Sequence, residues 1–275
     1  MSDTYALNDP ISEASIHSLA EEMEQQASDE QNRAFLDLYL QQTPFRHGSR
    51  VLEIGCGTGA IARRLARIEP SAIVDALDVS PLLVAVAEGL SVDDHNLHFT
   101  VGDAHKLPWG SAQFDIVVFH STLSHIHDPV HALAEANRVL KEGGHLLIFE
   151  ADYAAFHLAN GPGDPLELVA IATAAEAGVD SWLVRRLPHY LASNGFSIER
   201  DQVFAYKVTE ASEHLLRLID RGVDSLVVKS LAGPVLAAAL KGEVRRRIAL
   251  GFFNGLLPYA WILAKKPWID AGGGI

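Results

Sequence analysis

Three glycines at alternate positions, Gly55, Gly57 and Gly59, follow a short apolar run at residues 51–54. A residue without a Cβ lets the backbone approach a bound molecule closely, and its N–H groups can then face that molecule. Apolar residues at helical spacing follow at residues 61–68. The stretch therefore predicts a strand, a ligand-binding turn and a helix, in that order.

Acidic residues stand near the ends of three expected strands. Glu53 is close to the end of the first, Asp78 to the end of the second, and Asp103 follows the third. In an open parallel sheet the ligand lies beyond the carboxyl ends of the strands, where these side chains would gather. They would favour a ligand that carries positive charge.

One alternative ligand is a dinucleotide. Gly57, Gly59 and Ala62 match the loose pattern G-x-G-x-x-A, and Asp78 follows at about the expected distance. However, Glu53 would bring a carboxylate close to the pyrophosphate, whereas a ligand with an amine and a sulfonium would be favoured there. An NAD-dependent dehydrogenase stays open as the less favoured function.

The elements that must position these residues alternate between strand and helix patterns along residues 50–152. This alternation predicts an α/β fold with a Rossmann-like, mostly parallel sheet and helices on both faces. Seven strands are expected, at residues 51–54, 73–79, 98–101, 114–119, 145–149, 196–208 and 259–264. The helix that opens at Asp128-Pro129 is expected to end at Gly143-Gly144, and the last strand to begin after Pro258.

Residues 1–47 carry two amphipathic helical patterns. The first is expected to begin at Asp9-Pro10, and the second at Ser28, which forms a capping-box pattern with Gln31. Beyond residue 152, helical patterns cover residues 182–193, 210–229 and 235–250. These helices predict a helical cap on the sheet.

The motifs together resemble the class I S-adenosylmethionine-dependent methyltransferases of type 11, which are similar to the enzymes of ubiquinone and menaquinone biosynthesis. The resemblance covers about residues 50–150. Any one of its five motifs is common, but all five in this order and spacing are specific. They lie at residues 51–59, 76–81, 101–109, 114–118 and 138–144.

The resemblance implies S-adenosylmethionine as cofactor and S-adenosylhomocysteine as product. Its methionine part would be held by Glu53 and by the turn formed by Gly55, Cys56, Gly57 and Gly59.

For the nucleoside part, the resemblance implies that Asp78 accepts hydrogen bonds from the ribose hydroxyls. Val79 and Leu83 would pack on the adenine, Asp103 would receive its exocyclic amine, and the Ala104 N–H would face a ring nitrogen.

Four histidines lie within residues 120–131. Their spacing is typical of a loop rather than of a metal site, so no metal is expected. The resemblance implies that the backbone of His120 lies near the methionine amine. The resemblance implies that His125 shapes the loop beside the cofactor, and His125 is also the candidate for a catalytic base or substrate contact.

Candidate acceptor-binding residues lie outside the cofactor motifs. They are Tyr5, Phe156, Trp182 and Arg185. We expect a cap at residues 1–47, a cofactor-binding core at 48–152, and the rest of the core with inserted substrate-cap helices at 153–275.

The composition narrows the range of partners. The chain has 275 residues, a formal net charge of −13, one cysteine and no long apolar run. The acidic charge disfavours a nucleic-acid partner, the lone cysteine fits a reducing compartment, and neither a signal peptide nor stable membrane insertion is expected. We expect a cytoplasmic protein. The oligomeric state stays open, and a homodimer is one of the alternatives.

The function expected is transfer of a methyl group from S-adenosylmethionine to oxygen, nitrogen or carbon of a small molecule of secondary or cofactor metabolism. The main alternative is an enzyme of the same fold that binds this cofactor but catalyses another reaction, such as a cyclisation.

Overall fold

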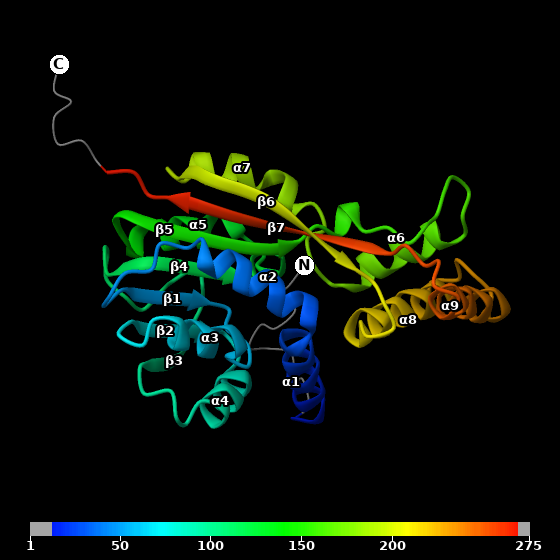
Figure 1. The fold of residues 1–275 in the computed structure, drawn as a ribbon, viewed down its shortest axis with the longest axis horizontal. Helices are drawn as coiled ribbons and strands as arrows, with labels where there is room; N and C mark the ends of the chain where they lie inside the picture. Colours follow the sequence, from blue (N-terminus) through cyan, green and yellow to red (C-terminus); the bar gives the residue numbers. More distant parts are fainter. Residues whose placement is uncertain (1–12, 269–275) are drawn as a thin grey trace, which may run out of the picture.

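A computed structural model describes residues 13–268 of the chain, and its centre is a seven-stranded sheet (Figure 1). The strand order is β3-β2-β1-β4-β5-β7-β6. The first five strands are parallel, and β7 runs antiparallel to both β5 and β6. The strands are β1 (Arg50–Ile54), β2 (Ile73–Asp78), β3 (Leu97–Val101), β4 (Phe114–His120), β5 (Leu140–Ala151), β6 (Ser197–Lys207) and β7 (Leu256–Lys265). The expected mostly parallel sheet is confirmed.

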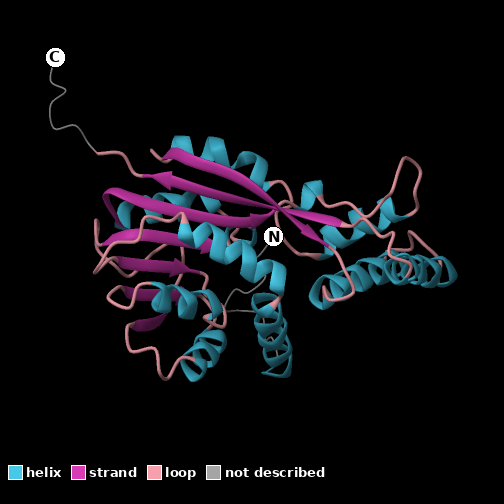
Figure 2. Cartoon of the chain, viewed as in Figure 1, coloured by secondary structure: helices cyan, strands magenta, loops and turns pink. Residues whose placement is uncertain are grey.

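Helices cover both faces of the sheet (Figure 2). Alternate residues of β1 enter different apolar clusters: Val51 packs in one, and Leu52 and Ile54 in the other. Successive side chains of a strand point to opposite faces, so a strand buried on both faces is apolar at nearly every position. The helices that pack on these faces include α2 (Glu30–Gln41), α3 (Ala60–Ile68), α4 (Pro81–Leu90), α5 (Pro129–Val139) and α7 (Leu183–Ser193).

The remaining helices lie toward the carboxyl ends of the parallel strands (Figure 1). They are α1 (Glu13–Ser28), α6 (Leu166–Glu176), α8 (Glu213–Val228) and α9 (Pro234–Ala249), with the short 3-10 turns η1 (Leu123–His125) and η2 (Tyr153–Ala155). The sequence patterns indicated α1, α8 and α9 but not α6. None of the helices within residues 13–268 combines the length and apolar character that crossing a membrane requires.

The cap of α2 differs from the expected capping box. Asp29, not Ser28, is the N-cap residue, and its Oδ1 accepts hydrogen bonds from the backbone N–H groups of Gln31 and Asn32, both at 3.0 Å. Ser28 ends α1 and donates its hydroxyl to the Gln25 carbonyl. The expected start of the first helix at Asp9-Pro10 lies outside the described residues.

Two other boundaries were wrong. The helix α5 ends at Val139 instead of continuing to Gly143-Gly144. The reason is that the backbone N–H groups of residues 112 and 113 donate hydrogen bonds to the last carbonyls of the helix, the one from Gln113 reaching the Val139 carbonyl at 2.7 Å. The buried Leu140 already pairs with Phe114 as the start of β5. Pro258 lies inside β7 instead of before it, and its carbonyl accepts the N–H of Asp152.

Candidate functional site

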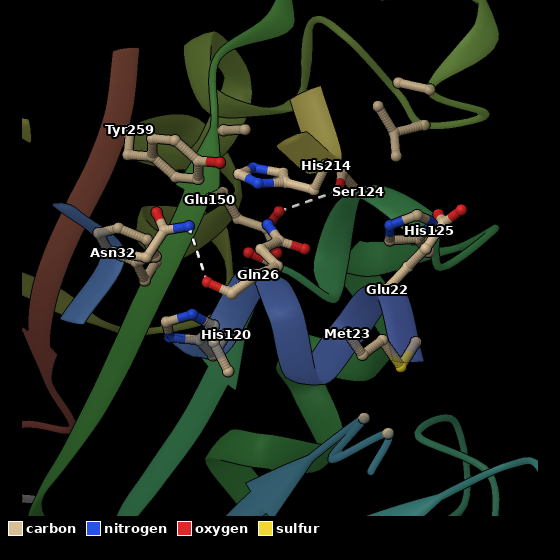
Figure 3. A pocket seen from close by; sticks show the side chains of 18 of the residues that line it. Glu22, Met23, Gln26, Asn32, His120, Ser124, His125, Glu150, His214 and Tyr259 are labelled. Carbon is tan, nitrogen blue, oxygen red and sulfur yellow. Dashed lines mark hydrogen bonds between the residues drawn. The ribbon is translucent and has the colours of Figure 1, made fainter. Parts of the chain in front are cut away.

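Two adjoining cavities open at the carboxyl edge of the sheet, one of about 390 Å³ and a smaller one of about 130 Å³. They share five lining residues: Met23, Gly55, Gly57, Ser121 and His125. Figure 3 shows the larger cavity, which receives side chains from α1, α2, β4, β5, α8 and β7. The volume of the larger cavity is in the range of small-molecule sites.

The glycine turn lies where the two cavities adjoin, and both Gly55 and Gly57 line each of them. Gly55 and Gly57 have φ angles of +76° and +52°, which favour glycine. A Cβ at Gly55 would lie 2.1 Å from the Thr122 side chain, and one at Gly57 would lie 3.0 Å from Met23 Sδ. Both positions therefore favour glycine for backbone conformation, and Gly55 also needs it for space.

The N–H groups of this turn do not point at the cavity as expected. Those of Gly55 and Cys56 donate to the Leu77 carbonyl at 2.7 and 3.0 Å, and that of Gly57 donates to Asp78 at 2.8 Å. Backbone donors are satisfied where they can be, and here they tie the turn to β2. What the turn offers a ligand is close approach and shape rather than free donors.

Asp78 ends β2 between the turn and α4. Its Oδ2 accepts the Gly57 N–H and its Oδ1 accepts the Ser80 N–H at 2.9 Å. Each carboxylate oxygen has a second lone pair for a ligand hydroxyl. Burial raises the pKa of Asp78, whereas the backbone hydrogen bonds from Ser80 and Gly57 act to lower it.

Glu53 lies one residue before the end of β1 and is 1% exposed. Its Oε2 has no hydrogen-bond partner among residues 13–268. Burial, and then the nearby Asp78, raise the pKa of Glu53 well above its usual value, and Arg63 only partly opposes them. A cationic group bound beside Glu53 would supply the missing partner and charge.

The smaller cavity is lined mainly by apolar residues and by Asp103. Val79 and Leu83 are positioned by the start of α4, where Ser80 Oγ accepts the Leu83 N–H and proline occupies the first turn. Ala104 also lines this cavity.

Asp103 is bonded to its neighbour His105. The His105 N–H and ring Nδ1 both lie 2.8 Å from Asp103 Oδ1. Partial burial acts to raise the pKa of Asp103, but these hydrogen bonds outweigh it and the pKa is lowered. The carboxylate is thus charged and keeps a second oxygen for a ligand amine.

Both candidate histidines line the larger cavity, and His125 lines both. His120 Nδ1 lies 2.7 Å from the Tyr39 hydroxyl, and its ring stacks on Phe149 at a centroid distance of 4.8 Å. Burial lowers the pKa of His120 to about 3 and that of His125 to about 4. Both imidazoles are therefore neutral near pH 7.

Buried Glu150 lines the cavity although the sequence patterns did not indicate it. Its Oε1 accepts the N–H groups of Thr122 and Leu123 at 2.7 and 2.6 Å, and its Oε2 accepts the Ser124 hydroxyl at 2.9 Å (Figure 3). Burial raises the pKa of Glu150 to about 7. The carboxyl group holds the turn η1 that carries His125.

Other polar lining residues come from elements distant in sequence. Gln26, Asn32, His214 and Tyr259 belong to α1, α2, α8 and β7. Each stands in an ordinary helical or strand pattern, so no local signal could have singled it out.

Three of the expected acceptor-binding residues are not among the lining residues of either cavity. Phe156 is buried in the apolar core. Trp182 is 59% exposed and lies under the Arg185 guanidinium, 5.0 Å from the ring centroid. Tyr5 lies outside the described residues.

No group of three or more His, Cys, Asp or Glu side chains that could hold a metal ion occurs within residues 13–268.

Comparisons with known proteins agree with this geometry. A protein-family profile described as "Methyltransferase domain" matches residues 52–148. The chain is 36% identical over 109 residues to the ubiquinone/menaquinone biosynthesis C-methyltransferase of Stutzerimonas stutzeri, a match covering 38% of this chain and 43% of that protein. It is 37% identical over 109 residues to the 27-O-demethylrifamycin SV methyltransferase of Amycolatopsis mediterranei, covering 38% and 39%. The chain thus spans less than half the length of these curated relatives.

Among solved structures, the chain is similar to phosphoethanolamine N-methyltransferase 2 of Haemonchus contortus in complex with S-adenosyl-L-methionine. The TM-score is 0.59 at 18% identity, and the likeness covers 94% of this chain and 58% of that one. At this identity, the likeness shows the fold.

Proposed function

Because residues 52–148 match the family profile described as a methyltransferase domain, we propose that the chain is a class I S-adenosylmethionine-dependent enzyme that transfers the methyl group of this cofactor to a small molecule. The cofactor would lie across the glycine turn, with its nucleoside in the smaller cavity and its methionine arm reaching the larger one. The acceptor would occupy the rest of the larger cavity.

The observation that carries this proposal is the buried carboxylate of Glu53. Its Oε2 atom has no hydrogen-bond partner among the described residues, and the side chain lies beside a turn in which Gly55 and Gly57 have positive φ angles. A pyrophosphate would add negative charge to an unpaired carboxylate, whereas the amine of a methionine arm would pair with it. This favours the sulfonium cofactor over NAD.

The other cofactor contacts follow from the strand ends. Asp78 would accept hydrogen bonds from the ribose hydroxyls through its remaining lone pairs. Val79 and Leu83 would pack on the adenine, and Asp103 with Ala104 would bind its polar edge. These groups all line the smaller cavity.

Bound S-adenosylmethionine supplies a methyl group on a positively charged sulfur, and the leaving sulfur is neutral. The chain's task is then to align the acceptor with that methyl group and to exclude water, and alignment can contribute ~7–11 kcal/mol. Helices α1, α2, α6 and α8 each contribute lining residues to the larger cavity. We assign to these helices the role of a cap over the acceptor.

His125 remains the proposed acceptor contact within the core. Its imidazole is neutral near pH 7, since burial lowers its pKa to about 4, so it can hydrogen-bond an acceptor both as donor and as acceptor. The division into core and cap and the cytoplasmic location belong to the same proposal. The absence of a nucleic-acid partner also belongs to it, and the net charge of −13 supports that absence.

The test is a calorimetric titration of the full chain with S-adenosylhomocysteine and, separately, with NAD. We expect binding of the first alone. A second measurement follows the formation of S-adenosylhomocysteine from S-adenosylmethionine in the presence of a low-molecular-mass cell extract. Binding of NAD alone would replace the proposal with a dehydrogenase, and cofactor binding without product formation would favour a non-methylating reaction.

A further inference from the structure

Part of the wall of the larger cavity comes from elements outside residues 52–148. Gln26, Asn32, His214 and Tyr259 converge there from α1, α2, α8 and β7 (Figure 3). Because these positions lie outside the matched methyltransferase domain, they are where this chain would set its own acceptor specificity.

His214 presents a neutral ring to the cavity. None of its described contacts is a hydrogen bond, and its ring packs edge-on against Tyr206 at a centroid distance of 5.7 Å. Burial lowers the pKa of His214, and Asp29 and Glu22 oppose this while Arg217 adds to it. A neutral imidazole offers one N–H donor and one acceptor nitrogen.

Asn32 adds a second hydrogen-bonding group. Its Nδ2 donates to the Gln26 carbonyl at 3.0 Å, whereas its Oδ1 is buried and has no partner within residues 13–268. A buried amide oxygen is normally hydrogen-bonded, so this atom calls for a donor on the ligand. Asn32 lines the larger cavity, so a ligand that reaches into the cavity beside it can supply this donor.

One network holds these two residues in relation to each other. Asp29 Oδ1 accepts the Asn32 N–H at 3.0 Å, and Asp29 Oδ2 accepts the Tyr206 hydroxyl at 2.8 Å. The Tyr206 ring in turn supports His214. The Asn32 backbone and the Tyr206 hydroxyl thus share one carboxylate, and the Tyr206 ring packs against His214. These contacts fix Asn32 and His214 relative to each other before a ligand binds.

The charges of the wall disfavour an anionic acceptor. Arg221 is the only Lys or Arg among the described residues that line the larger cavity, and it pairs with Glu22 at 3.3 Å. Four carboxyl groups line the same cavity: Glu22, Glu53, Glu150 and Glu176. A carboxylate or phosphate on the acceptor, in addition to the carboxylate that the methionine arm of the cofactor brings, would lose its hydration and meet no unpaired cation.

Apolar side chains make up a large part of the remaining wall. Five leucines and one aromatic ring belong to it, namely Leu19, Leu36, Phe149, Leu215, Leu218 and Leu257. We propose that the acceptor is an uncharged, mostly apolar molecule whose hydroxyl group donates to Asn32 and accepts from His214. This inference rests on the proposed function and names the substrate class of the same site.

Three compounds with one ring system test it: 2-naphthol, naphthalene and 2-naphthoate. Their binding to the full chain is measured by calorimetry after saturation with S-adenosylhomocysteine. We expect 2-naphthol to bind about tenfold or more tightly than 2-naphthoate. His214→Phe and Asn32→Leu should each weaken 2-naphthol binding about fivefold, the equivalent of one hydrogen bond, and should leave naphthalene binding unchanged.

His189→Phe is the matched control, since His189 is exposed on α7 and outside the cavity lining. If His214→Phe fails to fold, His214→Gln tests the same point, because it keeps a donor and an acceptor and should retain most of the affinity. The inference is overturned if 2-naphthoate binds as tightly as 2-naphthol, if neither cavity substitution affects 2-naphthol, or if 2-naphthol does not bind. Failure of S-adenosylhomocysteine to bind overturns the proposed function instead, and the three compounds can still be compared on the free chain.

Discussion

Two carboxylates near the glycine turn differ in how fully the chain satisfies them. Both oxygens of Asp78 accept a backbone N–H, whereas Glu53 Oε2 accepts no hydrogen bond among the described residues. The folded chain thus supplies hydrogen bonds to both oxygens of Asp78, whereas Glu53 Oε2 would gain its partner from a bound ligand. The two residues are expected to respond to substitution in different ways.

Asp78→Ala should weaken the binding of S-adenosylhomocysteine by ~1.5–3 kcal/mol, because hydrogen bonds to a charged group are lost. Titration calorimetry measures this directly. Asp201→Ala is the control, since Asp201 is exposed on β6 and lines neither cavity. Equal affinity of Asp78→Ala and the wild type would remove Asp78 from the binding site.

Glu53→Gln should have opposite effects on ligand-free stability and on binding. Burial and then Asp78 raise the pKa of Glu53 in the folded state. The unfolded state therefore loses the Glu53 proton at a lower pH than the folded state does, and this difference lowers the free energy of unfolding at pH 8. The substitution should therefore raise the thermal midpoint of the free protein at pH 8.

The same substitution, Glu53→Gln, should also weaken S-adenosylhomocysteine binding by ~1.5–3 kcal/mol, since the pairing of amine and carboxylate is lost. Thermal unfolding and calorimetry on one sample separate the effects, and a parallel fall in both would contradict this assignment.

At the scale of elements, α1 is attached to the cofactor turn by one acidic side chain. Glu24 accepts the Thr58 hydroxyl at 2.6 Å, and both its oxygens lie 2.8 Å from the Arg63 guanidinium. The neighbouring Met23 packs against Gly57. The helix α1 thereby covers the turn on which the cofactor would lie.

Glu24→Gln should loosen α1 and weaken S-adenosylhomocysteine binding by up to ~1 kcal/mol, the range of partly exposed ion pairs. Amide hydrogen exchange in α1 should become faster, and the salt dependence of binding should decrease. Glu21→Gln, an exposed position on the same helix, serves as the control. Unchanged exchange in α1 would show that apolar packing alone holds the helix.

The N-cap of α2 gives a second prediction at this scale. Asp29→Ala should reduce the free energy of unfolding by ~0.5–2 kcal/mol, the usual cost of a lost N-cap, and it also removes the acceptor of the Tyr206 hydroxyl. Ser28→Ala should cost less than about 0.5 kcal/mol. Urea unfolding of both variants distinguishes the two capping assignments, and a larger cost for Ser28→Ala would restore the capping box.

At the scale of the whole molecule, buried Glu150 makes stability depend on pH. Burial raises its pKa to about 7 in the folded state from a usual value of 4.5. Below the usual value both states are protonated and Glu150 contributes nothing. As the pH rises toward 7 the unfolded state ionises first, and stability falls by about 3 kcal/mol, at 1.36 kcal/mol per pKa unit.

Glu150→Gln should therefore flatten the loss of stability between pH 5 and pH 8. Urea unfolding of the wild type and the variant at both pH values measures the difference in slope. The hydrogen bonds from Thr122, Leu123 and Ser124 favour the charged form and so reduce this loss of stability, but burial outweighs them. Parallel pH profiles would mean that Glu150 is ionised throughout this range.

Local patterns in the sequence predicted the sheet and its order of elements, because alternation of apolar residues, caps and glycine turns are short-range signals. The turn at Gly55 and Gly57 and the acidic strand ends at Asp78 and Asp103 were found in this way. The same signals misplaced boundaries where distant contacts intervene. Asp29 prevailed over Ser28 as a cap while also bonding Tyr206, and the 112–113 loop ended α5 at Val139.

The cavity wall could be identified only from the tertiary structure. Asn32 and His214 are separated by most of the chain and stand in ordinary helical patterns, yet they meet through Asp29 and Tyr206. The same applies to the turn's N–H groups, which bond to β2 instead of facing the ligand. The sequence alone thus determined which ligand-binding turn this chain carries, because a turn depends on adjacent residues. The fold decided what surrounds the acceptor, because a cavity depends on residues brought together from separate elements.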